Sequence, residues 1–199
     1  MDIDRFWGLV ESARSAAVAA GEPFDEALVK LLAGLSTQEI LEFEARFSEA
    51  HDALYRWDVW AAAYLIGGGC SDDSFIDFRA GVIALGREWY ERAAAEPDGL
   101  AGHPAVTEAA QLYGDEAALL EGRAKLYDEA LFYEEVNYAA GTAFERRTGD
   151  RDAFYAARAE SGGRGSTEGD MGEAFDFDDD KEMHRRLPRL AGLFLEPTP

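Results

Sequence analysis

The sequence has a single cysteine and no long apolar run. Because Cys70 has no second cysteine among the 199 residues, no internal disulfide can form and nothing requires an oxidising compartment. No hydrophobic stretch approaches the roughly 20 residues that a membrane span needs. The opening residues 1–4 are acidic, whereas a secretory signal begins with a basic segment. These absences predict a soluble, cytoplasmic protein that does not enter a membrane.

Basic residues are scarce as well. The chain carries 19 Lys and Arg against 40 Asp and Glu, which gives a formal net charge of −21. Such a balance argues against direct binding to nucleic acid or to anionic membranes, and it favours a protein partner with a basic or neutral surface. An acidic mimic of nucleic acid is a further alternative, and a plain acidic surface without a binding role is the simplest explanation.

Strict alternation of apolar and polar residues is absent, whereas apolar residues recur at helical spacing through most of the chain. Stripes such as Phe6, Val10, Ala13 and Ala17 are typical of amphipathic helices, and Ser36 with Glu39 forms a capping box. The length suits one large domain. We therefore predict an all-α protein, one compact helical domain over residues 1–199 with about seven to nine helices.

Several boundaries follow from the same patterns. A long helix is expected from Ser71 to beyond Trp89, with Gly81 and Gly86 inside it where a neighbouring backbone could approach closely. Residues 97–104 are expected to be a linker, and residues 115–147 one long helix or two helices broken near Gly141. A mobile Gly-rich loop is predicted over 161–172, and residues 173–199 are predicted to pack back on the body.

The segment from Trp57 to Gly86 concentrates unusual residues, and it contains the candidate pocket of this sequence. Three glycines at 67–69 must end one helix, and two aspartates open the next. An aromatic stripe precedes the turn, and carboxylates follow it with an arginine expected on the polar side of the helix. The candidate pocket residues are Trp57, Trp60, Tyr64, Cys70, Asp72, Asp73, Asp77 and Arg79.

Each of these residues also has a purely structural explanation. Asp72 and Asp73 compensate the dipole of the helix that they open, and Asp77 with Arg79 could form an ordinary surface pair. Trp57 and Trp60 could simply belong to the core. A reactive thiol at Cys70, just before a helix start, is the alternative to a small buried residue.

Metal-site signatures are poor. The three histidines, His51, His103 and His184, are far apart and form no paired motif. The Asp-x-Asp-x-Asp run that begins at Asp176 resembles a calcium loop, but Lys181 replaces the required Gly and Leu187 the bidentate Glu. We predict no metal site and no cofactor, and the sequence assigns no catalytic residue.

Several spaced blocks resemble a known family. They are Asp-Arg-Phe-Trp at 4–7, Trp-Asp-x-Trp-Ala-Ala-Ala-Tyr at 57–64, Gly-Cys-Ser-Asp-Asp-x-Phe-x-x-Phe-Arg at 69–79 and Leu-Pro-Arg-Leu at 187–190. Together they resemble the bacterial domain-of-unknown-function family 4240 over nearly the whole chain. The resemblance supplies no reaction, cofactor or partner. Some relatives are attached to regulator-like or DNA-associated domains, which implies an accessory role.

The sequence thus favours a non-catalytic protein-interaction or accessory protein. The main alternative is an enzyme or small-molecule or metal-binding protein with its site at the helix corner between Trp57 and Arg79. The nucleic-acid mimic is the second alternative.

Overall fold

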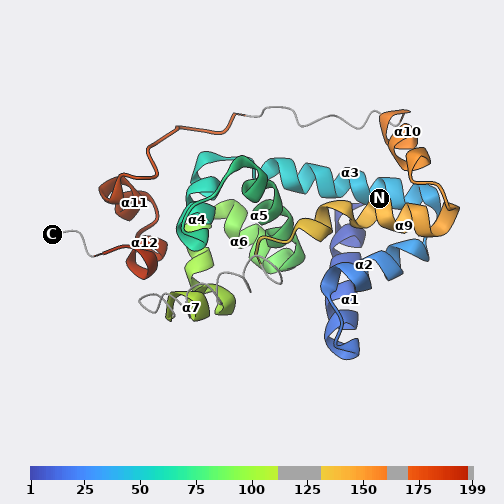
Figure 1. Cartoon of the computed structure of the whole chain (residues 1–199), viewed down its shortest axis with the longest axis horizontal. Coiled ribbons are helices and arrows are strands. Elements are labelled where there is room, and N and C mark those ends of the chain that lie inside the picture. Colours follow the sequence, from blue (N-terminus) through green and yellow to red (C-terminus); the bar gives the residue numbers. More distant parts are fainter. Residues whose placement is uncertain (112–130, 161–169, 197–199) are drawn as a thin grey trace.

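The computed structural model describes residues 1–111, 131–160 and 170–196 of the chain. All regular elements in these ranges are helices (Figure 1), so the predicted all-α class is confirmed. The α-helices are α1 (Ile3–Ala20), α2 (Phe24–Ala33), α3 (Thr37–Ala53), α4 (Trp57–Gly67), α5 (Asp72–Ala84), α6 (Arg87–Ala95), α7 (Pro104–Gln111), α9 (Ala139–Thr148), α10 (Asp152–Glu160), α11 (Asp180–Arg186) and α12 (Pro188–Phe194). Two 3-10 helices, η1 (Pro97–Gly102) and η2 (Glu134–Tyr138), complete the described elements.

The described ranges contain more helices than the seven to nine that were expected, and some of these helices are shorter than predicted. The long helix predicted from Ser71 past Trp89 ends at Ala84, and α6 begins at Arg87. Gly86 separates the two helices with a φ of 92°, a backbone conformation that favours glycine. The glycine therefore breaks the helix that it was expected to continue.

Buried apolar side chains form two clusters, and α5 contributes to both. One cluster lies among α1, α2, α3 and α9 and includes Phe6, and the other gathers around α4, η1 and α12 and includes Leu190. From α5, Phe78 joins the second cluster and Ile83 the first. In Figure 1 this helix lies near the centre of the molecule. Two buried faces explain why α5 has no single apolar stripe.

Close approach of a neighbouring backbone at Gly81 is confirmed. A Cβ atom at this position would lie 2.2 Å from the carbonyl oxygen of Leu131. Nearby, the backbone N–H of Tyr133 donates to the carbonyl of Asp77 at 3.1 Å. The chain from Leu131 to Tyr133 therefore runs directly against α5, and only glycine leaves room for it.

Residues 97–104 are not the linker that was expected. Most of them form η1, whose Asp98 is only 3% exposed. This carboxylate accepts hydrogen bonds from the backbone N–H groups of Arg189 at 3.1 Å and Leu190 at 2.9 Å, so it caps the start of α12. The cap and the burial of Phe194 hold α12 against η1 and α4.

The predicted long helix over residues 115–147 lies partly outside the described residues, which omit 112–130. Of the remainder, η2 precedes α9, and Gly141 lies inside α9 where a helix break was considered. A Cβ on Gly141 would lie 3.3 Å from the ring of Phe154, so this glycine admits a ring of α10. Most of the predicted Gly-rich loop, residues 161–169, likewise lies outside the described part.

The corner between α4 and α5 forms as the glycines predicted. Gly68 ends α4 in the left-handed conformation at φ 65°, and Ser71 caps α5 by accepting from the N–H of Ser74 at 3.1 Å. On the other side, α4 begins anew at Trp57 after α3 has ended at Ala53. These turns bring the end of α3, the start of α4 and the start of α5 together. No helix among the described residues has the length and apolar character needed to cross a bilayer.

Candidate functional site

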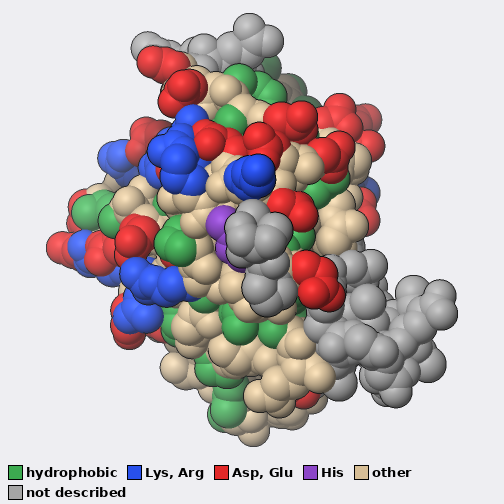
Figure 2. Space-filling view, turned by 90° about the vertical axis from the view of Figure 1, so that its left-hand side faces the viewer, with side chains coloured by type: hydrophobic (Ala, Val, Ile, Leu, Met, Phe, Trp, Pro, Cys, Tyr) green, Lys and Arg blue, Asp and Glu red, His purple; other side chains and the backbone are tan. Residues whose placement is uncertain are grey.

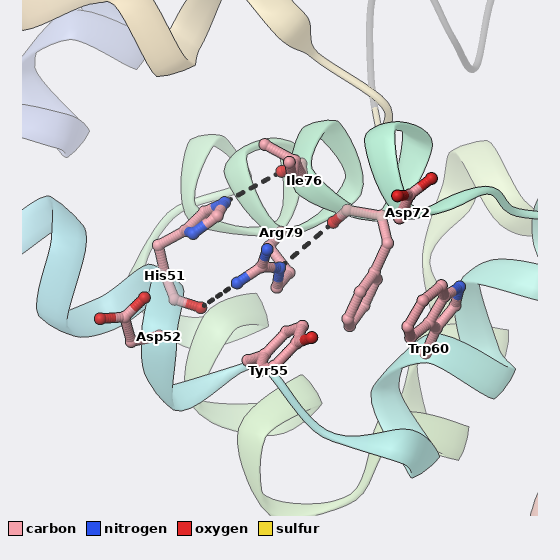
Figure 3. Close-up of a pocket in the computed structure, with 8 residues that line it drawn as sticks. His51, Asp52, Tyr55, Trp60, Asp72, Ile76 and Arg79 are labelled. Carbon is pink, nitrogen blue, oxygen red and sulfur yellow. Dashed lines mark hydrogen bonds between the residues drawn. The ribbon is translucent and has the colours of Figure 1, made fainter. Parts of the chain in front are cut away.

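A pocket of about 290 Å³ opens where α3, α4 and α5 meet. Figure 3 shows its side chains arranged around the guanidinium of Arg79. Aromatic rings and an aliphatic side chain form much of the wall, and ionisable groups stand among them. The lining residues are His51, Asp52, Tyr55, Trp60, Asp72, Phe75, Ile76 and Arg79.

Arg79 is the central charged group of the pocket. The residue is only 5% exposed. Its Nε donates to the carbonyl of Phe75 at 3.3 Å and its Nη1 to the carbonyl of His51 at 3.2 Å. The guanidinium carbon lies 4.9 Å from the ring centres of both Tyr55 and Phe75, which allows cation–π contact. Arg79 thus lies between two rings and two main-chain carbonyls.

One consequence of this position is structural. His51 belongs to the last turn of α3, where carbonyls lack partners within the helix. A cation at that end also interacts favourably with the helix dipole. Burial lowers the pKa of Arg79 to about 10, so the side chain still carries its charge at neutral pH. Arg79 therefore helps to cap α3 from a neighbouring helix.

The hydrogen bonds of Arg79 leave one side of the guanidinium free. Within the described ranges, Arg79 forms no ion pair with a carboxylate, and its Nη2 donates to no protein group. Buried side-chain nitrogen and oxygen atoms in these ranges all have partners. Nη2 is therefore not sealed inside the protein, and Arg79 is one of the residues that line the pocket. It can donate to a ligand there.

His51 lies beside Arg79 and is neutral. Its Nε2 lies 3.0 Å from the carbonyl of Ile76, and because a carbonyl oxygen can only accept, Nε2 carries the proton. Burial and then the charge of Arg79 lower the pKa of His51 to about 4. The imidazole thus links α3 to α5 and adds no positive charge to the pocket.

Two carboxylates flank the guanidinium on either side (Figure 3). Asp72 is exposed in the first turn of α5, next to Trp60. Asp52, at the end of α3, is half-buried; burial raises its pKa and the nearby charge of Arg79 partly offsets that rise. With Arg79 positive and His51 neutral, the pocket carries groups of both signs.

Of the eight predicted site residues, the structure brings three into this pocket: Trp60, Asp72 and Arg79. The expectation that Arg79 lies on the polar side of its helix beside Asp77 is wrong. Its side chain points into the protein and binds carbonyls. An arginine two positions from Asp77 on a helix projects in a different direction.

The other two aromatic residues of the candidate set, Trp57 and Tyr64, lie outside the pocket, behind Trp60. Trp57 stacks on Trp60 with ring centres 5.5 Å apart, and Trp60 stacks in turn on Phe75 at 4.7 Å. The hydroxyl of Tyr64 donates to Asp178 at 2.6 Å. Trp57 and Tyr64 therefore support the pocket wall from behind and do not line the pocket.

Cys70 does not have the surroundings of a reactive thiol. Burial raises the pKa of its thiol to about 12, so the thiolate is scarce at neutral pH. Its carbonyl accepts from the indole N–H of Trp60 at 3.0 Å, which fixes that ring against the turn. Cys70 is therefore better explained as a structural residue of the turn than as a reactive thiol.

Asp73 and Asp77 lie outside the pocket. Asp73 is exposed at the start of α5. Asp77 accepts from the side-chain amide of Asn137 at 3.1 Å, and burial, followed by the nearby Glu134, raises its pKa to about 6. Asp72, Asp73 and Asp77 therefore lie in three different environments, and of the three Asp72 lines the pocket.

Sequence reasoning missed five lining residues: His51, Asp52, Tyr55, Phe75 and Ile76. His51 and Asp52 belong to the end of α3, and Tyr55 follows in the turn before α4; the sequence does not connect this region to α5. One signal was present, because Arg79 stands in the apolar run from Phe78 to Ile83. A charge in such a run has to be buried with partners or to mark a site.

A second pocket of about 270 Å³ continues the first along α3. The two share His51, Asp52 and Ile76. At its far side Arg158 of α10 forms an ion pair with Glu44 at 3.2 Å, and burial raises the pKa of this glutamate. Across the ranges that the structure covers, no group of three or more His, Cys, Asp or Glu residues is arranged to hold a metal ion.

Fold and site together define an all-α protein with an aromatic pocket built around a buried arginine. The chain belongs to the DUF4240 family of proteins of unknown function, whose family model matches residues 1–146. This range contains the whole first pocket, whereas α10 to α12 and the Leu-Pro-Arg-Leu block at 187–190 lie beyond it. The resemblance therefore covers less of the chain than the sequence blocks indicated. No curated protein and no solved structure matches the chain.

Proposed function

We propose that this protein is a non-catalytic binding protein that takes a small molecule in the pocket between α3, α4 and α5. The observation that carries the proposal is Arg79: a charged side chain, 5% exposed, that lines the pocket and whose Nη2 bonds to no group of the described residues. Burying a charge is costly unless its hydrogen bonds are completed. A ligand with an acceptor group would complete them. The proposal keeps the accessory role expected from the sequence and gives it a ligand.

The size of the pocket supports a small ligand. Pockets that bind small molecules occupy roughly 300–1,000 Å³, and this one, at about 290 Å³, stands at the lower end. Aromatic and aliphatic side chains with a few polar groups are the usual lining of such sites. A metabolite of modest size fits this description better than a folded domain does.

The chemistry of the pocket supports binding over turnover. A general base needs a pKa near the working pH and a free lone pair aimed at the reacting group. His51 is neutral, but its ring is held by Ile76, and its pKa of about 4 makes it a weak base. Cys70, the one thiol, is not among the lining residues. The proposal accordingly includes no chemical step, and it includes a cytoplasmic location, which the single cysteine supports.

A thermal-shift screen with small metabolites tests this proposal, because a ligand that binds only the folded state raises the melting temperature. The critical variant is Ile76→Arg, which places a long side chain at the pocket from a residue that is 41% exposed. The matched control is Ile3→Arg, on a residue that is 46% exposed on α1 and lines neither of the two pockets.

We expect at least one metabolite to raise the melting temperature of the wild type and of Ile3→Arg but not of Ile76→Arg. Mass spectrometry should recover that metabolite unchanged after prolonged incubation. If no compound produces a shift, or if the shift survives Ile76→Arg, the proposed site is wrong. Chemical conversion of the metabolite would instead favour the alternative that the protein is an enzyme.

A protein-interaction role is the second candidate, and exposed apolar residues beside the second pocket favour it. Ile76 and Tyr138, which is 49% exposed, stand there with Glu44 and Asp52. Glu44 is buried and paired with Arg158, so Asp52 supplies the acidic charge beside these apolar residues, and a partner with a basic or neutral surface suits them. In a pull-down, Tyr138→Ser should lose a partner that the wild type captures, whereas Tyr155→Ser, equally exposed on α10 and outside both pockets, should retain it.

The nucleic-acid mimic would need acidic groups along one extended face. Figure 2 shows a face on which basic side chains lie among the acidic ones. Pairs such as Arg186 with Glu173 at 2.8 Å and Arg189 with Glu96 at 3.0 Å offset part of the acidic charge. We do not propose this function, because mixed charge of this kind does not resemble the uniform charge of a nucleic-acid backbone.

A further inference from the structure

Groups of opposite charge stand at two ends of the same pocket without pairing with each other. The Nη2 of Arg79 bonds to no group of the described residues, and Asp72 is exposed at the start of α5. We propose that the ligand is a zwitterionic α-amino acid with an apolar side chain, whose carboxylate binds Arg79 and whose ammonium binds Asp72. This inference rests on the proposed function, since it names the ligand class of that same pocket.

Helix geometry places the two groups at a suitable separation. Asp72 and Arg79 are seven residues apart, which is two turns, so they lie on the same face of α5 about 10 Å apart along its axis. The guanidinium reaches back toward the start of the helix, because its Nε donates to the carbonyl of Phe75. Along the axis Phe75 lies about 4.5 Å from Asp72, so the guanidinium lies nearer to Asp72 than the backbone of Arg79 does. One carbon joins the charged groups of an α-amino acid, and with a hydrogen bond of about 2.8 Å at each end such a ligand spans a gap between these two axial distances.

The signs of the charges exclude simpler ligands. A phosphate or a dicarboxylate would be attracted by Arg79 but repelled by Asp52 and Asp72, within a protein of net charge −21. A plain amine would pair with Asp72 but leave Nη2 without an acceptor and add a second cation beside Arg79. A molecule that carries a negative and a positive group can pair with Arg79 and with Asp72 at the same time.

The remaining walls determine the side chain. Trp60 and Phe75 are stacked on each other beside Asp72, and Ile76 lies on the same helix. Covering these surfaces with an apolar group of the ligand lowers the free energy of the complex. The same surfaces offer no partner to an additional charged group on the ligand. A third charged group on the ligand would meet either Asp52 or this apolar wall. An aliphatic or aromatic side chain therefore fits, and an acidic one does not.

Isothermal titration calorimetry with defined compounds tests the inference. We expect L-leucine or L-phenylalanine to bind, and L-glutamate to bind at least about tenfold more weakly because its extra carboxylate is repelled. Phenethylamine, which lacks the carboxylate, and N-acetyl-phenylalanine, which lacks the ammonium, should each lose about tenfold or more relative to phenylalanine. Inorganic phosphate should not bind in the pocket.

Two neighbouring variants supply the matched comparison. Asp72→Asn removes the charge that holds the ammonium, and Asp73→Asn removes a neighbouring exposed carboxylate that does not line the pocket. We expect Asp72→Asn to weaken amino-acid binding about tenfold and to leave N-acetyl-phenylalanine unchanged, whereas Asp73→Asn should alter neither affinity. Equal losses in both variants would overturn the assignment of Asp72.

The failure of this inference can be told from the failure of the proposed function. If metabolites of another class bind and Ile76→Arg abolishes their binding, the pocket is a ligand site but the amino-acid assignment is wrong. If neither amino acids nor any other compound binds the wild type, both are wrong.

Discussion

At the scale of residues, Asp77 and Arg79 show how two positions on one helix meet opposite surroundings. Asp77 faces η2 and its acidic neighbours, including Glu134, whereas Arg79 lies between aromatic rings. A helix turns about 200° over two residues, so side chains two apart diverge. The sequence spacing suggested a surface pair, but the directions of the side chains prevent it.

Asp77 provides a pH-dependent prediction. Its pKa rises from 3.8 to about 6 on folding, mainly through burial, so the ionised form is disfavoured in the folded state. The resulting loss of stability develops as the pH rises from about 4 to about 6 and is complete above that range. Asp77→Asn, which resembles the protonated acid, should therefore raise the free energy of unfolding at pH 7.5. Because solvent reaches this half-buried group, we expect less than about 1 kcal/mol.

Urea denaturation of both proteins from pH 4 to pH 7.5 measures this effect. The stabilisation by Asp77→Asn should shrink steadily as the pH falls toward 4, close to the unfolded pKa of 3.8, because the wild-type carboxyl is then protonated in the folded state and increasingly in the unfolded state. A variant that is less stable than the wild type at pH 7.5 would contradict the prediction. It would mean that the hydrogen bond from Asn137 outweighs burial.

At the scale of elements, α5 is the helix on which the rest depends. Both of its faces are buried, and it supplies residues to both apolar clusters and to the pocket. The backbone at Leu131 lies directly against α5 at Gly81. A helix that packs in two directions tolerates changes of volume poorly, because neither side can relax without disturbing the other.

Gly81→Ala tests that packing. The added methyl group would lie 2.2 Å from the Leu131 oxygen, which belongs to the backbone and cannot rotate away. We expect a loss of about 1–3 kcal/mol in unfolding free energy, measured by chemical denaturation. The control is Gly8→Ala in α1, where a Cβ meets nothing within 4 Å. That change should be neutral or stabilise by up to about 1 kcal/mol.

A Gly81→Ala protein as stable as the wild type would show that the chain at Leu131 can move away from α5 at little cost. An equal loss in Gly8→Ala would assign the effect to some general feature of glycine replacement. Either result would remove the packing explanation for this glycine.

At the scale of the whole molecule, charge is the dominant global property. The formal charge of −21 is spread over a chain whose surface arginines form ion pairs, for example Arg87 with Glu91 and Arg92 with Glu88. Such exposed pairs contribute little, typically under about 1 kcal/mol each. The excess of 21 negative charges therefore determines how the fold responds to ions.

Added salt should stabilise this protein. Raising NaCl from about 10 mM to about 150 mM shortens the Debye length from about 30 Å to about 8 Å, which screens repulsion between distant acids. We expect a higher melting temperature by calorimetry. Choline chloride at the same ionic strength should give a similar rise, because screening does not depend on the identity of the cation. A fall in melting temperature would show that the ion pairs outweigh the net repulsion.

Much of the fold could be predicted because it depends on local signals. The apolar stripe from Phe6 to Ala17 lies within α1, and the capping box at Ser36 and the glycine stop at 67–69 operate as expected. The misjudged elements depended on distant contacts. Residues 97–102 read as a linker, but they are buried by α12, which is some 90 residues away in the sequence.

The sequence by itself determined the helical class, the start of α3 at its capping box and the corner at residues 67–73, since these follow from periodicity, capping and glycine. It also placed three of the pocket residues, since they are close together in the chain. Only the tertiary structure decided that the end of α3 lies against α5 and that Arg79 points inward to its carbonyls. That arrangement depends on which faces of α5 are buried, and burial is set by neighbours that spacing along one helix does not specify.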